Sequence, residues 1–269
     1  YPSMNCWWSV ACWTMSFMRS RKGMAMRNVV LIAKRELKSY FATPVAFVFI
    51  VIFLALTGAF AFFMGGFFSR GQADLEPFFA YHPWLYLLFI PAISMRLWAE
   101  ERKTGTIENL MTLPISTSEA VVGKFLAAWL FSGISLMLTF PIWVTVNVLG
   151  EPDNGVIIAS YAGSLLMAGG FLAIGSCLSA VTKNQVIAFI AAATVCFLFT
   201  MSGVDLVLNF FRGWAPDILV DTIASFSFLT HFNAVTKGVI EANDLAFFAS
   251  LIVFWLFANV VVVELRKAR

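Results

Sequence analysis

Charged residues are scarce in this 269-residue chain. Asp, Glu, Lys and Arg together make up 12% of the residues, whereas hydrophobic types make up 60% and the mean hydropathy is +0.84. A soluble domain carries roughly 25% charged residues, which it needs to keep its surface compatible with water. The composition nearly excludes a water-soluble enzyme and predicts a protein that crosses the membrane several times.

Residue types that build catalytic and metal sites are also scarce. The two histidines are His82 and His231, and both are expected at the outer face of the membrane. Paired carboxylates or a Ser-His pair do not converge within the apolar segments. The four cysteines have no metal-ligand spacing. We therefore predict no disulfide framework, no metal site and no catalytic residues; the cysteines are Cys6, Cys12, Cys177 and Cys196.

The sequence also lacks a phosphate-binding loop. Gly123-Lys124 has Ser118 where the first glycine of such a loop would stand, and it is followed by Phe125 instead of Ser or Thr. We expect the chain to bind no cofactor, with ATP and Mg held by a separate subunit.

Long stretches without Asp, Glu, Lys or Arg mark the expected membrane spans. A spanning helix needs about 20 mostly apolar residues, and lipid offers no partners for backbone polar groups outside regular structure. These stretches do not alternate with period two, so we predict an all-α membrane protein with six transmembrane helices. The six stretches are Val45–Phe68, Pro77–Met95, Phe125–Gly150, Asn154–Thr182, Asn184–Val204 and Leu245–Val263.

Basic residues divide unevenly between the two sides of these spans. If both termini are cytoplasmic, Arg70, Arg212 and Lys237 are the only three of the 18 Lys and Arg residues on the outer side. Cytoplasmic loops carry an excess of Lys and Arg. The sequence therefore predicts a multi-pass protein of a bacterial cytoplasmic (inner) membrane with both termini cytoplasmic.

Two segments precede the first span. Residues 1–25 open on Tyr1 and place a Trp-rich stretch before a basic cluster, the reverse of a signal peptide, so we interpret them as an upstream extension, with an extra interfacial segment as the alternative. Residues 26–44 predict a cytoplasmic amphipathic helix that ends before Pro44, followed by a permease domain over 45–269. Its apolar face holds Val30, Ala33, Leu37 and Tyr40 or Phe41, and its polar face holds Lys34, Arg35, Glu36 and Lys38.

The last loop, between Val204 and Leu245, is unusually long. It is apolar enough for two short helices but is broken by Asp217, Asp221, His231 and Lys237. We expect a re-entrant or interfacial helical hairpin at the outer face. A seventh span is the alternative, which length and charge disfavour.

The connection from Arg96 to Lys124 is dense in charge. Gly105 is expected to end the preceding helix, the stretch from Thr106 to Leu113 to form a short amphipathic helix that Pro114 stops, and Ser116 with Glu119 to form a capping box for the third span. A charged, solvated loop is the alternative.

The run AEERKTGTIENLMTLPIS, followed by Val-Val-Gly-Lys, resembles the cytoplasmic coupling segment of ABC type-2 permeases. Through YFATPVAFVFIVIF and EERKTGTIENLMTLP the chain is most similar to the gliding-motility-associated subgroup. The resemblance covers Met26 to Arg269. It implies an N-terminal amphipathic elbow helix, a cytoplasmic coupling helix between spans 2 and 3, and an outer-face hairpin between spans 5 and 6.

The resemblance also implies partners and site residues. Expected partners are two copies of an ABC ATPase, a second permease copy or sibling, membrane lipid and a periplasmic or accessory membrane component, but no nucleic acid. Glu101 and Arg102 are the foremost candidates for ion pairs with the ATPase. The full set of predicted coupling residues is Glu100, Glu101, Arg102, Gly105, Thr106, Ile107, Glu108, Leu110, Leu113 and Pro114.

Two functions fit these features. The first is the permease subunit of an ATP-driven exporter, and the second is a mechanotransmission or anchoring subunit that relays ATPase motion to a periplasmic partner without moving a solute. An ion-coupled carrier is disfavoured because the spans carry almost no ionisable residue, with Arg96 and His82 the nearest candidates. His82 is expected to be packed or interfacial. Small residues of span 4, such as Gly169 and Gly175, are expected to pack mainly within the chain.

Overall fold

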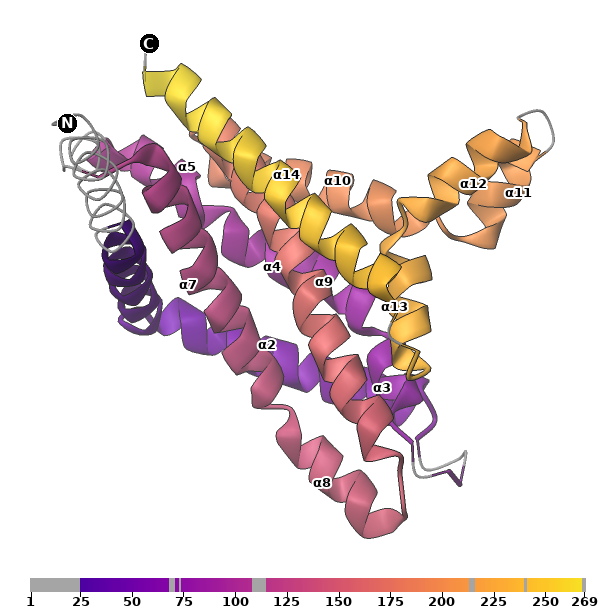
Figure 1. Cartoon of the computed structure of the whole chain (residues 1–269). Helices are drawn as coiled ribbons and strands as arrows, with labels where there is room; N and C mark the ends of the chain where they lie inside the picture. The colour runs from indigo at the N-terminus through magenta and orange to yellow at the C-terminus, as the bar shows by residue number, and fades with distance from the viewer. Residues whose placement is uncertain are drawn as a thin grey trace, which may run out of the picture.

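The computed structural model describes residues 25–67, 71–72, 74–107, 115–212, 216–239 and 241–267. These residues form a helical bundle (Figure 1), as predicted. A first helix covers residues 25–41. The further elements are α2 (Pro44–Ala59), η1 (Phe60–Met64), α3 (Glu76–Ala80), α4 (His82–Ser94), α5 (Arg96–Thr104), α7 (Thr117–Met137), α8 (Phe140–Leu149), α9 (Asn154–Val181), α10 (Gln185–Met201), α11 (Asp205–Arg212), α12 (Asp217–Ser225), α13 (Phe228–Thr236) and α14 (Ala242–Lys267).

Local signals in the sequence set several helix boundaries. Thr43 is extended and Pro44 opens α2, so the helix over 25–41 ends where the Thr-Pro pair predicts. Gly105 has a φ of 75° and ends α5, a conformation that suits glycine. Ser116 and Glu119 form both hydrogen bonds of the predicted capping box at the start of α7. These three predictions are confirmed.

Four of the six predicted spans appear as helices of sufficient length and apolarity. Within the described residues they are Pro44–Met64, Thr117–Leu149, Asn154–Val181 and Ala242–Arg266. The fifth predicted span is the 17-residue helix α10. The second differs from a continuous helix, because α3 ends at Ala80 and α4 has 13 residues. Pro83 explains the break, since it lacks the N–H that would bond the carbonyl of Phe79.

The segment before α14 contains the two expected short helices. The helices Ile218–Ser225 and Phe228–Thr236 are bent by 65° relative to each other, and together they would count as a fifth candidate span. The prediction is confirmed for these two helices, but the segment also contains α11, which was not predicted.

Helix α9 lies at the centre of the bundle and contacts α4, α5, α7, α10, α13 and α14. Its small residues allow the close packing. A Cβ on Gly169 would lie 3.1 Å from the indole nitrogen of Trp129, and one on Gly175 would meet Ser94. The small residues of this helix therefore serve packing within the chain, as predicted.

The described parts nearest the two termini lie at one end of the bundle. In Figure 1 the helix over 25–41 lies at the left, and α5 and the C-terminal end of α14 lie at the upper left, whereas α3 and the α8–α9 turn lie at the opposite end. We call the first of these ends the α5 end.

Candidate functional site

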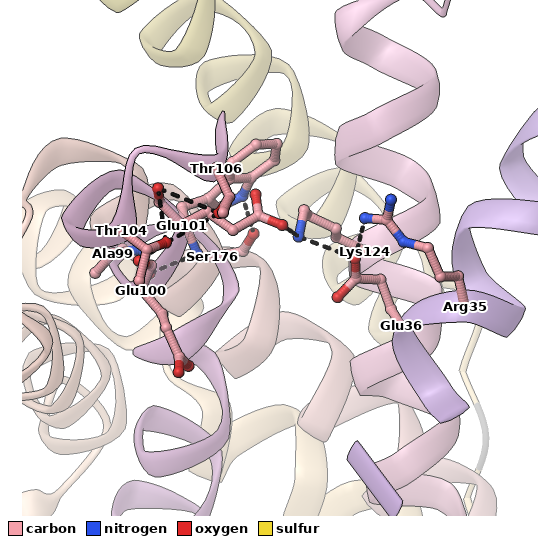
Figure 2. A network of polar contacts seen from close by, with 11 residues as sticks. Arg35, Glu36, Ala99, Glu100, Glu101, Thr104, Thr106, Lys124 and Ser176 are labelled. Carbon is pink, nitrogen blue, oxygen red and sulfur yellow. Dashed lines mark hydrogen bonds and ion pairs between the residues drawn. The ribbon is translucent and has the colours of Figure 1, made fainter. Parts of the chain in front are cut away.

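The most heavily charged part of the described interior lies at the α5 end. We name it the charged junction and define it by Arg35 and Glu36 of the first helix, Glu101 of α5, and Lys124 of α7. Figure 2 shows how these side chains converge from three separate elements. They border a cavity of about 420 Å³.

Lys124 is the centre of the charged junction. Only 1% of this residue is exposed. Its Nζ donates to Oε1 of Glu101 at 2.7 Å and lies 3.3 Å from Oε1 of Glu36. The same nitrogen lies 5.3 Å from the centre of the Trp98 ring, within the range of a cation–π interaction. A buried lysine is tolerated because opposite charges and an aromatic face replace its water.

The first helix packs along α7 through a regular series of contacts. Asn28 donates to Glu119 at 3.2 Å, Glu36 pairs with Lys124, and Tyr40 stacks on Phe131 with ring centroids 5.2 Å apart. The two helices therefore run parallel. Gly123 permits the close approach, since a Cβ there would lie 2.8 Å from Cβ of Ile32.

Helix α5 is fixed to α9 by a separate set of hydrogen bonds. Oγ of Ser179 accepts from the backbone N–H groups of Trp98 and Ala99, both at 3.2 Å, and donates to the carbonyl of Met95. The Trp98 indole donates to Ser176, and Nη1 of Arg102 donates to the carbonyl of Ala180. These bonds tie α5 to the central helix of the bundle.

Burial and neighbouring charges shift the pKa values of several groups in and beside the charged junction. Burial alone would raise the pKa of Glu36, but the charge of Lys124 and the hydrogen bond and charge of Arg35 outweigh it, and the pKa is lowered. Burial raises the pKa of Tyr40, with a smaller contribution from Glu36. Glu100 accepts two hydrogen bonds from Arg96, at 2.9 and 3.2 Å, which raises the pKa of the guanidinium.

The structure places the predicted coupling residues in two groups. Glu101 and Arg102, expected to pair with an ATPase, both have partners inside this chain, namely Lys124 and Ala180. Gly105 and Thr106 are exposed, and Ile107 is half-buried. Outside the described residues lie Glu108, Leu110, Leu113 and Pro114, and with them most of the predicted coupling helix.

The polar face of the first helix also divides. Lys34, Arg35 and Lys38 are exposed, whereas Glu36 turns into the charged junction. Sequence reasoning did not single out Lys124, Ser176 or Ser179. Lys124 did carry a signal, because a lysine two turns into an otherwise apolar helix needs a buried partner.

His82 is packed, as predicted. It is fully buried, its Nδ1 lies 2.9 Å from the carbonyl of Phe78, and the rings of Phe53, Phe79 and Tyr86 surround it.

A comparison with protein families matches residues 30–263 to the family described as "ABC-2 family transporter protein". The chain belongs to this family. It is the membrane permease component of an ABC-2 transporter, a non-catalytic subunit whose family implies partnership with an ABC ATPase. A search of curated proteins gave no match. In this ABC-2 permease the charged junction joins α5 to α7 and to the first helix.

Proposed function

We propose that this ABC-2 permease is the membrane subunit of an ATP-driven exporter and that the charged junction transmits ATPase motion to the spans. Six spans, both termini and the Arg96–Lys124 connection on the cytoplasmic side, and an outer-face hairpin belong to the proposal. It also includes two ATPase copies, a second permease copy or sibling, and the closer relation to gliding-motility-associated permeases.

The observation that carries the proposal is the bridge from Glu101 through Lys124 to Glu36. It connects α5, the first part of the Arg96–Lys124 connection, with α7 and with the first helix. The bridge is largely buried, and α5 is also hydrogen-bonded to α9. A displacement of α5 therefore also displaces the first helix, α7 and α9, because the contacts between them are rigid. A solvated loop would dissipate such a displacement.

The predicted coupling residues then have two roles. Glu101 transmits motion through Lys124, and Arg102 helps to hold α5 on α9. The ATPase contact falls to Gly105, Thr106 and Ile107, together with Glu108, Leu110, Leu113 and Pro114 of the proposed coupling helix. Glu100 stays paired with Arg96 at the edge of the cavity. The exposed side chains of Lys34 and Lys38 face anionic lipid at the membrane surface, whereas Arg35 pairs with Glu36.

The test separates docking from transmission. The permease is coexpressed with its ATPase, and copurification is compared with the rate of ATP hydrolysis by the assembled complex. Changing Thr106→Arg should reduce copurification by adding charge at the contact. A Glu36→Gln, Glu101→Gln, Lys124→Met triple change, which leaves no member of the bridge charged, should leave copurification intact but abolish the change in ATP turnover that assembly with the wild-type permease produces.

The matched control is an Arg96→Gln, Glu100→Gln double change. It removes an ion pair from the same helix, but this pair is partly exposed and spaced i,i+4, so it should have little effect. If the complex with the Glu36→Gln, Glu101→Gln, Lys124→Met permease turns over ATP like the wild type, the charged junction does not transmit motion.

A further inference from the structure

A second pair of titratable side chains joins the short helices at the far end of the bundle from α5. His231 lies on α13 and Asp244 in the first turn of α14. Nδ1 of His231 lies 2.6 Å from Oδ1 of Asp244, and the imidazole stacks on Phe247 with ring centroids 4.1 Å apart. The other ring nitrogen, Nε2, lies 2.9 Å from the carbonyl oxygen of Ser225, the last residue of α12.

The geometry places an acceptor opposite each ring nitrogen. A carbonyl oxygen never donates, and an ionised carboxylate only accepts. Neutral imidazole has one N–H and satisfies one of the two contacts, whereas imidazolium has two and satisfies both. The full arrangement therefore requires a protonated ring.

Asp244 supplies an independent argument for the positive charge. The residue is 5% exposed, and within the described residues its Oδ2 is buried without a hydrogen-bond partner. A buried carboxylate is costly unless an opposite charge lies beside it. His231 is the cationic partner that the geometry provides.

We infer that His231, Asp244 and the Ser225 carbonyl form a pH-sensitive clip, closed when His231 is protonated, that holds α12 against α13 and α14. As the pH rises and the ring loses a proton, one of its two hydrogen bonds is lost. The contact between Nδ1 and Asp244 is the shorter one, so the bond to Ser225 breaks and the 65° bend between α12 and α13 is released. Helices α11 and α12 then move relative to the rest of the bundle.

The surroundings leave few other groups to drive such a response. Helices α9 and α10, which pack against α13, carry no Asp, Glu, Lys or Arg. The remaining charges on nearby elements of the described part of the chain are Asp217 and Asp221 on α12, Glu76 on α3, and Lys237 and Glu241 between α13 and α14. Asp244 is the charged group whose contact with the ring is direct.

Spin labels on the full chain in lipid nanodiscs test the clip. Cysteines replace the exposed residues Thr222 of α12 and Ala249 of α14 in a background without the four native cysteines. The distance distribution is recorded over a pH series. It should be narrow at the acidic end, where the clip is closed, and broader at the alkaline end. The response should vanish in His231→Gln and persist in the control His82→Gln.

A second measurement uses the wild-type chain without spin labels, so that its result does not depend on whether a variant folds. The chain has two histidines, so nitrogen-15 NMR of labelled histidine gives two sets of ring signals, which His82→Gln assigns. Both nitrogens of His231 should be protonated at the acidic end of the pH series, where the distance distribution is narrow, and one of them at the alkaline end, where it is broad. An unchanged distance distribution in the wild type, or a response that survives His231→Gln, would overturn the clip.

Discussion

Lys124 is the residue on which the charged junction depends. Its ammonium group lies between two carboxylates that are themselves mostly buried, with exposed side-chain fractions of 20% for Glu101 and 16% for Glu36. Within the described residues, Oε2 of Glu101 already lacks a hydrogen-bond partner. The lysine is therefore the charge that makes two neighbouring carboxylates tolerable.

We predict that Lys124→Met strongly destabilises the permease. Methionine fills a similar volume but leaves Glu101 and Glu36 without their common counter-charge, and breaking a buried pair costs about 3 to 5 kcal/mol. Thermal unfolding in detergent, followed by tryptophan fluorescence, measures the loss. Neutralising all three positions, with Glu36→Gln and Glu101→Gln added, should recover most of it; a triple variant as unstable as Lys124→Met would show that packing, not charge, is the cause.

Acid should weaken the same site through Glu36. Because the pKa of Glu36 is lowered in the folded protein, its carboxylate stabilises the fold above the ordinary titration range of glutamate. That contribution is lost as the pH falls through the lowered value. We predict that Glu36→Gln flattens the decline of the unfolding temperature as the pH falls below about 5, the upper edge of the ordinary titration range of glutamate. The exposed Glu264 provides the control: Glu264→Gln should follow the wild-type curve, and parallel curves for all three proteins would contradict the assignment.

At the scale of elements, the pairing of the first helix with α7 depends on Gly123. A Cβ at this position would lie 2.8 Å from both Cβ and Cγ2 of Ile32 and 3.2 Å from the carbonyl of Val29. The Cβ of Ile32 and this carbonyl cannot rotate away, so the whole helix has to shift and Glu36 moves relative to Lys124.

We predict that Gly123→Ala destabilises the permease by about 1 to 3 kcal/mol through overpacking, partly offset by the better helix propensity of alanine. Gly58 in α2 is the matched control, because a Cβ there meets nothing within 4 Å. Gly58→Ala should leave the unfolding temperature unchanged or raise it. Equal effects of the two substitutions would mean that the close approach at Gly123 has no energetic importance.

Some elements could be predicted from local sequence and others could not. Pro44, Gly105 and the Ser116–Glu119 capping box act on backbone groups within a few residues, so their effects were visible in the sequence. The interruptions at Tyr81 and at Leu138–Thr139 were missed because the apolar stretches looked continuous. In both cases a proline follows within three residues and removes a backbone donor.

The ion-pair partners within the charged junction could not be predicted without the tertiary structure. Glu101 was expected to face another subunit, yet it pairs with Lys124, 23 residues away, because α5 is bonded to Ser176 and Ser179 of α9. No local pattern specifies which side of α5 faces α9. The hydrophobic stretches indicate approximately where helices form, whereas the packing of other helices around α9 determines which charged side chains meet.

At the scale of the whole molecule, the two ends of α14 relate the charged junction to the His231 clip. Arg266, near the C-terminal end of α14, is close enough to Arg102 that its charge contributes to the lowered pKa of that guanidinium, after burial. Helix α14 continues without interruption from Ala242 to Lys267. At a rise of about 1.5 Å per residue, Asn243 lies about 35 Å from Arg266, slightly more than the hydrocarbon thickness of a bilayer.

We predict that Thr106 and Asn243 lie on opposite sides of the membrane, with Thr106 cytoplasmic. Both residues are exposed, and the excess of Lys and Arg lies on the side of Thr106. Single cysteines at these positions, in a background without native cysteines, are treated with an impermeant maleimide. In intact spheroplasts Asn243→Cys should react at once and Thr106→Cys only after the membrane is permeabilised. Reaction of both from the outside would be incompatible with α14 as a span, and the reverse pattern would place the charged junction on the side where no ATPase could reach it.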